Sequence, residues 1–395
     1  MLKSKVSHSI NPDDFQMGVE CGEKIAKELS DVKVSFLYTS VESNINKVIE
    51  GVNSKLNAPL IGCTSSGGVI VPEGIITSEK NFAGMLSLND PDMVVGVAAH
   101  EAGKDPRLVG RKVAIKAVEN AKTTRAPSYF YMVATPGVEE EYLMGIEDVI
   151  GRVPMFGGSA ADDNFEGKWK IICNNEVISD GVAVAFFYTD NEIVTSFTGA
   201  YKETNNMGLI TKVKGDRILE EIDRVSALKK YAHWTNIAPS NLKGSNLLLS
   251  SITKPLGIKD PLGTLTVIRH PMFGNDMGTK TMNDDTITLG NKIIEGTAII
   301  QLEASKNDLI NACGETLKDL RRKVYYHPAA YLLMHSAGRM LGIGNRIGEV
   351  HKQLLKETKG VPFIAPFVYG EYGYEEHSSN ICGGLMLSFT VFSRK

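Results

Sequence analysis

Apolar residues follow two periods along this chain, and the order of the two periods repeats. The segment "VKVSFLYTSV", residues 32–41, is β-branched and aromatic as strands are, and apolar residues then recur at helical spacing up to Leu56. The same order returns after "SYFYMVATPG", residues 128–137, and after "AAYLLMHSAG", residues 329–338. The pattern predicts three strand-helix pairs.

Each predicted helix reaches a proline (Pro59, Pro154 and Pro362), then a loop rich in small residues, and then further strands. Two of these loops resemble each other: "PLIGCTSSGGVI", residues 59–70, and "VPMFGGSAADD", residues 153–163. Three copies with proline at the same point predict an α/β protein built from internally similar strand-helix-loop-hairpin units. Mixed sheets flanked by helices are the expected architecture.

A chain of 395 residues is too long for one ordinary core, so two domains are expected. A polar stretch, "YKETNNMG", precedes apolar residues that predict a helix from about Asp216 to Val225. We therefore expect the boundary near residues 203–215, with one domain at 1–214 and the other at 215–395.

Charge and composition exclude several classes of partner. The net charge is −3, and neither sign collects into a block, whereas a nucleic acid favours a basic face. No stretch approaches the roughly 18 apolar residues of a membrane span. Five scattered cysteines form no CxxC pair, and their odd number argues against a disulfide framework. The expectation is a cytoplasmic protein that binds neither nucleic acid nor membrane.

The segment "HSAGRMLGIGNRIGEV", residues 335–350, runs from a strand through four glycines into a helix. Glycines expose main-chain N–H groups, and Arg339 and Arg346 would add a guanidinium fork that suits carboxylate or phosphate. An anion site is one interpretation, and glycines that only serve tight turns are an equally weighted one. The spacing is only loosely similar to a dinucleotide fingerprint with Glu371 as its acid, so a nucleotide-dependent enzyme ranks last.

Two further loops carry polar groups. Tyr369, Glu371, Tyr372 and Asn380 precede the last strand and could recognise an amine or a hydroxyl, although such residues also decorate hairpin ends without any ligand. Ser159 belongs to "FGGSAADDNF", whose two adjacent acids are better explained as turn-making residues than as a catalytic pair.

Catalytic and metal-binding patterns are weak. Cys63 is the best candidate nucleophile, but no histidine lies near it in sequence, and GxSxG is missing. The eight histidines show neither HExxH nor paired-ligand spacing. We expect no catalytic residue, no metal ligand and no cofactor, with a single histidine as axial haem ligand the alternative.

Several motifs together resemble the FIST sensory proteins, in which a FIST N domain precedes a FIST C domain. They cover about residues 32–393 and read, in order, "LIGCTSSGGVI", "PMFGGSAADDNF", "ISDGVAVAFF", "ILEEIDRVSALKKY", "KIIEGTAIIQL", "HSAGR" with Glu349, and "YGEYG" with Asn380. The chain departs from the family at Arg224, Ser226, Ser336 and Cys382. A cysteine common before "AGR" is Ser336 here, so cysteine chemistry is not available at that position.

The resemblance implies a ligand-sensing module rather than an enzyme, one that reports to a separate histidine kinase or another signalling output protein. An amino acid or a similar small anionic metabolite is the expected ligand, with its carboxylate at Arg339 and its ammonium at Glu371. A haem-binding nitric oxide sensor is the alternative that the family offers. The expected ligand-binding residues are Arg339, Glu371, Asn380, Gly370, Tyr372, Thr64, Ser65, Ser66 and Ser159.

Overall fold

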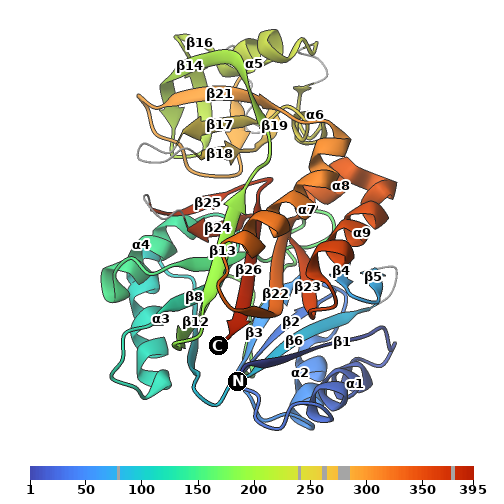
Figure 1. Ribbon diagram of the computed structural model, residues 1–395. Helices are drawn as coiled ribbons and strands as arrows, with labels where there is room; N and C mark the ends of the chain where they lie inside the picture. The colour runs from blue at the N-terminus through green and yellow to red at the C-terminus, as the bar shows by residue number, and fades with distance from the viewer. Residues whose placement is uncertain (78–80, 239–241, 260–264, 275–284, 375–378) are drawn as a thin grey trace.

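The computed structural model describes residues 1–77, 81–238, 242–259, 265–274, 285–374 and 379–395. Within these ranges the strands form three six-stranded sheets and a fourth, eight-stranded sheet. The three six-stranded sheets and the helices beside them make a body, and the fourth sheet lies above that body (Figure 1).

The body contains three units with the same order of elements. The first unit consists of β1 (Lys3–Ser9), α1 (Asp14–Ala26), β2 (Val34–Thr39), α2 (Ile45–Asn53), β3 (Leu60–Thr64), β4 (Gly68–Val71), β5 (Gly74–Thr77) and β6 (Ala83–Asn89). The second consists of β7 (Val94–Glu101), α3 (Pro106–Ala121), β8 (Tyr129–Ala134), α4 (Glu139–Ile150), β9 (Met155–Ser159), β10 (Ile171–Cys173), β11 (Glu176–Ile178) and β12 (Gly181–Tyr188).

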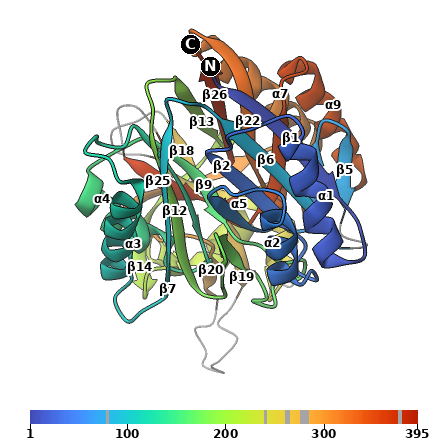
Figure 2. The ribbon, with the colours of Figure 1, turned by 90° about the horizontal axis from the view of Figure 1, so that it is seen from below.

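The third unit is interrupted after its first strand. It consists of β13 (Ile193–Thr198), α7 (Lys306–Arg322), β22 (His327–Ser336), α8 (Ala337–Ile343), α9 (Ile347–Thr358), β23 (Phe363–Val368), β24 (Glu371–Tyr374), β25 (Asn380–Gly383) and β26 (Leu387–Arg394). Viewed from below, the helices of the three units surround the strands (Figure 2). The expectation of similar α/β units with mixed sheets is thus confirmed.

Between β13 and α7 the chain forms the fourth sheet with its two helices, which we call the inserted domain. Its elements are β14 (Lys202–Lys214), β15 (Ile218–Ile222), β16 (Val225–Ser226), α5 (Ala227–Thr235), α6 (Asn246–Ser251), β17 (Leu256–Lys259), β18 (Thr266–Arg269), β19 (Pro271–Gly274), β20 (Ile287–Leu289) and β21 (Ala298–Glu303). The expected division into residues 1–214 and 215–395 stays a prediction.

The helix expected from Asp216 to Val225 is wrong, because this stretch forms the strands β15 and β16. β15 lies between β14 and β20 and also pairs with β16, so its main chain is used on both edges. Leu219 and Ile222 are buried in the sheet. β15 has only five residues, and apolar spacing over so short a stretch does not distinguish a helix from a strand.

Each unit gives its hairpin to a neighbouring sheet. The sheet orders are β1-β6-β2-β3-β10-β11, β7-β12-β8-β9-β24-β25 and β13-β26-β22-β23-β4-β5. The first unit's hairpin β4-β5 therefore extends the third sheet, the second unit's β10-β11 extends the first, and the third unit's β24-β25 extends the second. The three units are connected in a closed cycle.

Small residues in these strands allow close packing of neighbouring strands. In β3, a Cβ added at Gly62 would lie 1.8 Å from the carbonyl oxygen of Leu37, and in β9 one added at Gly157 would lie 1.9 Å from that of Met132. Both glycines face the parallel neighbour strand at the same register position. The likeness between the two small-residue segments thus has a packing cause.

Aromatic rings fill the space between the three sheets. Phe36 of the first sheet contacts Tyr131 and Phe156 of the second and Phe392 of the third, with ring centroids 5.2–6.5 Å apart. These side chains are buried in one core cluster, so packed side chains fill the centre of the body.

Among the described helices, none has the length and apolar composition to cross a membrane.

Candidate functional site

A cavity of about 240 Å³ lies where the inserted domain meets the body. The body contributes nine of its lining residues: Pro136, Glu139, Phe165, Trp169, Ser336, Gly338, Tyr369, Gly370 and Gly384. The inserted domain contributes Leu248, His270, Met272, Phe273, Gly290 and Asn291. Its two walls thus come from different layers of the molecule.

The body wall is made by segments that follow the strands of parallel pairs. Pro136 comes soon after β8, which pairs in parallel with β9, and Ser336 and Tyr369 lie at or just beyond the ends of the parallel strands β22 and β23. In α/β sheets, ligands bind at the carboxyl ends of the strands. The cavity occupies that position.

Three aromatic side chains form one part of this wall. The rings of Phe165 and Tyr369 stack at 4.3 Å between centroids with an angle of 6°, and Trp169 meets Tyr369 edge-on at 5.9 Å. The hydroxyl of Tyr369 donates to Asp162, whose carboxylate also accepts the N–H groups of Phe165 and Lys168. Asp162 is therefore a turn-making residue, and it fixes the aromatic group.

The opposite wall carries a histidine and an asparagine. His270 Nε2 lies 3.3 Å from the carbonyl oxygen of Leu248, and burial lowers the pKa of His270 to about 4, so the ring is neutral near pH 7. Asn291 is 2% exposed, and its Oδ1 has no hydrogen-bond partner among the described residues. A Cβ added at Gly384 would lie 3.3 Å from that oxygen.

Glu139, the first residue of α4, is the acidic group of the cavity. It is 2% exposed, and its carboxylate accepts hydrogen bonds from the N–H of Gly137 (2.9 Å), Ser159 Oγ (3.1 Å) and Arg217 (2.9 Å). Burial is the main cause that raises the pKa of Glu139, the neighbouring Glu140 adds to it, and Arg217 opposes both. A buried carboxylate with three donors is held in one place.

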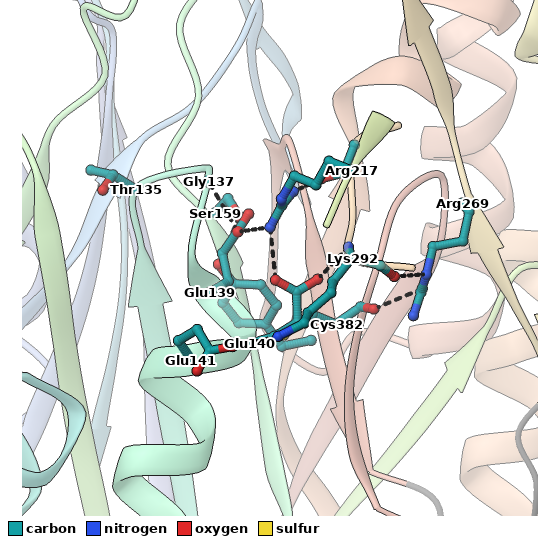
Figure 3. Close-up of polar contacts among 12 residues, drawn as sticks. Thr135, Gly137, Glu139, Glu140, Glu141, Ser159, Arg217, Arg269, Lys292 and Cys382 are labelled. Atoms are coloured by element: carbon teal, nitrogen blue, oxygen red, sulfur yellow. Dashed lines mark hydrogen bonds and ion pairs between the residues drawn. The ribbon is translucent and has the colours of Figure 1, made fainter. Parts of the chain in front are cut away.

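Glu139 is part of an ion-pair cluster that joins α4 to the inserted domain (Figure 3). Arg217, in the turn between β14 and β15, also binds Glu140 at 2.7 Å and the carbonyl of Gly290. Lys292 donates its N–H to Glu140 and its Nζ to Glu141, at 3.0 and 2.5 Å. We call these five charged residues, Glu139, Glu140, Glu141, Arg217 and Lys292, the α4 cluster.

Of the residues expected to bind ligand, Gly370 lines the cavity, and Ser159 and Tyr372 lie beside it without lining it. Ser159 Oγ is 2.6 Å from the hydroxyl of Tyr372 and donates to Glu139. Gly370 lines the cavity, and a Cβ there would lie 2.8 Å from Ser159 Oγ. Asn380 lies apart from this group and donates to Glu147 and to the carbonyl of Val153.

Thr64, Ser65 and Ser66 are engaged with main-chain groups. Ser65 Oγ donates to the carbonyl of Gly68 (2.6 Å) and accepts the N–H of Phe367 (2.8 Å), while Thr64 Oγ1 accepts the N–H of Lys170. The N–H of Ser66 donates to the carbonyl of Phe367. These residues join the first unit to its two neighbours.

Arg339 and Glu371 are both fully buried, and neither lines the cavity. Arg339 donates to the carbonyls of Gly199 (2.6 Å), Leu309 (3.0 Å) and Leu385 (3.3 Å). Glu371 Oε2 accepts the N–H of Met386 at 2.7 Å, and burial raises the pKa of Glu371, with Arg339 acting in the opposite direction. Their expected contact with a ligand stays a prediction.

The glycines around Arg339 also have packing partners. A Cβ at Gly338 would lie 2.6 Å from the Leu385 side chain, and one at Gly342 would lie 2.4 Å from Ile252. Arg346 pairs with Glu349 at 2.6 Å.

Sequence reasoning missed Glu139, Asn291 and Trp169, and it considered His270 only as one of several histidines that could bind haem. The available signal was the acidic run "EEEY" at the start of a helix, which normally only complements the helix dipole. The signal for Trp169 was an aromatic residue close to the small-residue segment that ends at Phe165. His270 and Asn291 come from the inserted domain, whose position no local pattern indicates.

The described residues contain no group of three or more His, Cys, Asp and Glu that could hold a metal ion. A haem in this cavity would need His270 as its axial ligand. The cavity encloses about 240 Å³, below the roughly 300–1,000 Å³ typical of sites for drug-sized ligands. The haem alternative stays a prediction.

Comparison with known proteins identifies the family. Residues 33–224 match the FIST N domain and residues 227–374 the FIST C domain. An uncharacterised protein of Methanocaldococcus jannaschii is 21% identical over 362 residues, which are 86% of this chain and 67% of that protein.

Similarity to solved structures is low. A cyanuric acid hydrolase from A. caulinodans aligns over 100% of both chains with a TM-score of 0.33 and 9% identity. A phosphoribosylformylglycinamidine synthase II from Thermotoga maritima aligns over 99% of this chain and 72% of its own, with a TM-score of 0.23 and 10% identity. The two domain matches cover most of the sequence, and the chain belongs to the FIST family, as a FIST N domain followed by a FIST C domain.

Proposed function

We propose that this protein is a cytoplasmic small-ligand sensor that acts in signal transduction, not as an enzyme, and that its ligand occupies the cavity between the body and the inserted domain. FIST domains are generally ligand-binding sensory domains in signalling. An amino acid or a metabolite of similar size is the ligand class. The sensor transmits its ligand-bound state to a separate partner, such as a histidine kinase or another signalling output protein.

The observation that carries this proposal is that the body and the inserted domain both line the cavity. Residues of the body and of the inserted domain line it together, so a ligand that contacts both changes how tightly the two pack. A ligand shifts such an equilibrium by the difference between its affinities for the two arrangements. A change in domain packing is a signal that a partner protein can read.

The chemistry of Cys63 supports binding rather than catalysis. It is buried in β3, and burial raises the pKa of its thiol. A nucleophilic cysteine needs the opposite environment, which favours the thiolate. All five cysteines are buried free thiols, in agreement with a reducing compartment.

The two tryptophans make the proposal directly testable, because Trp169 lines the cavity and Trp234 does not. In a Trp234→Phe variant, Trp169 alone reports, and we expect saturable changes in its fluorescence with at least one of the common amino acids. The matched Trp169→Phe variant should bind the same compound by calorimetry but without the fluorescence change.

Two results would reject the proposal. One is the lack of any saturable signal or heat across the amino acids and small amines. The other is binding that changes Trp234 and leaves Trp169 unaffected. A Soret band that shifts on reconstitution with haem would favour the haem alternative, and replacement of His270 should then remove the shift.

A further inference from the structure

Two polar groups on the cavity walls offer acceptors. Glu139 offers a carboxylate, and Asn291 an amide oxygen without a partner. Among the described residues that line the cavity there is no lysine or arginine. A ligand with a positive, hydrogen-bond-donating group complements these walls, and an amino acid would turn its ammonium rather than its carboxylate toward Glu139.

Asn291 is a second observation, independent of the acidic residues. Buried polar atoms nearly always have partners, and leaving one unpaired is destabilising. Its Oδ1 lies beside Gly384, and Gly384 also lines the cavity. A donor supplied by a ligand would satisfy this oxygen.

The three aromatic side chains on the cavity wall are a third observation. The faces of aromatic rings attract cations, most strongly where water is excluded. Phe165, Tyr369 and Trp169 lie on the same cavity as Glu139, and Asp162 fixes the ring of Tyr369. Carboxylate and aromatic faces together are the usual surroundings of a bound organic cation.

We infer that the cavity binds an organic cation of the protonated-amine class, whose charged group contacts Glu139 and competes there with Arg217. This rests on the proposed function and adds the ligand class and the means of coupling. Arg217 belongs to the inserted domain, and Glu139 to the body. A ligand cation that binds the Glu139 carboxylate weakens its ion pair with Arg217, and with it one contact between the body and the inserted domain.

Arg217 does not lose its place when the ligand binds, because Glu140 and the carbonyl of Gly290 still hold it. The cation thus loosens the α4 cluster without leaving a buried guanidinium alone. Coupling of this kind is reciprocal: any change that weakens the hold of Arg217 on Glu139 must strengthen cation binding.

The test compares benzylamine, benzyl alcohol and benzoate, which share a ring and differ in charge. Calorimetry on the wild type and Trp169 fluorescence in the Trp234→Phe background measure binding. We expect benzylamine to bind about tenfold or more tightly than either analogue, the ratio that about 1.4 kcal/mol provides. Equal binding of the alcohol or the benzoate, or no binding of benzylamine at millimolar concentration, overturns the inference.

Three variants test the coupling. Glu139→Gln keeps the shape and should lower benzylamine affinity about tenfold. In Glu140→Gln, Arg217 keeps only Glu139 as its carboxylate partner. Benzylamine affinity should then fall, but by less than in Glu139→Gln. Arg217→Gln should strengthen binding, because Glu139 then loses its competing guanidinium. If Glu139→Gln does not fold, the other two variants still test the inference, because benzylamine affinity should fall in Glu140→Gln and rise in Arg217→Gln. Unchanged affinity in both variants contradicts the inference.

Failure of this inference and failure of the proposed function are distinguishable. An amino acid or a neutral compound that quenches Trp169, with the same affinity in wild type and in Glu139→Gln, would overturn the cation class and its coupling. The sensor proposal would stand in that case, because the ligand would still occupy the cavity.

Discussion

Ser65 accepts a hydrogen bond of 2.8 Å from the N–H of Phe367, a residue 302 positions later in the chain. The same hydroxyl donates to the carbonyl of Gly68 at 2.6 Å. A single buried side chain thus joins the first unit to the third. Two further main-chain bonds, Ala161 to Thr64 and Tyr369 to Ser159, join the second unit to the first and the third to the second.

Replacing Ser65 with alanine should destabilise the body by about 1–3 kcal/mol, because the buried N–H of Phe367 loses its acceptor. Urea unfolding, followed by far-ultraviolet circular dichroism, measures the change. The exposed Ser30→Ala is the control and should unfold like the wild type. Equal midpoints for both variants would show that water replaces the hydroxyl.

Gly62→Ala should be among the most damaging small substitutions in the chain. The new methyl group would lie 1.8 Å from the carbonyl oxygen of Leu37, so β2 and β3 cannot keep their distance. We expect a loss above about 4 kcal/mol or insoluble protein. Gly348→Ala, in α9 with open space around it, should be neutral or stabilising by up to about 1 kcal/mol. Soluble yield and unfolding midpoint distinguish the two.

His270 should make the folded state sensitive to mild acid. The folded protein keeps this ring neutral down to about pH 4, whereas the unfolded chain binds the proton near pH 6.5. The free energy of unfolding should therefore fall as the pH decreases from 6.5 to about 4, by up to about 3 kcal/mol from this residue.

The comparison for this prediction is His270→Gln, whose unfolding free energy should depend less on pH in the same window. His233 is exposed, so His233→Gln should retain the wild-type profile. Parallel profiles for wild type and His270→Gln would contradict the lowered pKa.

Arg339→Lys keeps the charge but should still destabilise the protein by several kcal/mol. One ammonium cannot reach the carbonyls of Gly199, Leu309 and Leu385 in the three directions that the guanidinium covers, and each acceptor left unpaired costs about 1–3 kcal/mol. Thermal unfolding checks this. A variant with wild-type stability and lost ligand binding would instead support the direct ligand role expected from the sequence.

The repeating units were predictable because their signals are local. A strand, an amphipathic helix and a proline each depend on a few neighbouring residues, and Pro59, Pro154 and Pro362 recur at the same point of each unit. The exchange of hairpins was not predictable, since β10 and β11 have three residues each and their partner strand is more than a hundred residues away.

The site was predicted less well, for the same physical reason. Of the expected residues Gly370 lines the cavity, and Ser159 reaches it only through its hydrogen bond to Glu139, which had the sequence context of a solvated helix start. Arg217 of the inserted domain contacts the carboxylate of Glu139, which is 2% exposed. Burial of a charge by a distant segment leaves no trace in the local pattern.

The closed cycle of hairpins sets the order in which the chain can mature on the ribosome. The first sheet is complete only when residue 178 has emerged, the second when residue 383 has, and the third when residue 394 has. Incomplete sheets have free edges, which are prone to pairing with other chains. The third sheet thus keeps an open edge until β26 has emerged, and chaperone demand should decline only after that point.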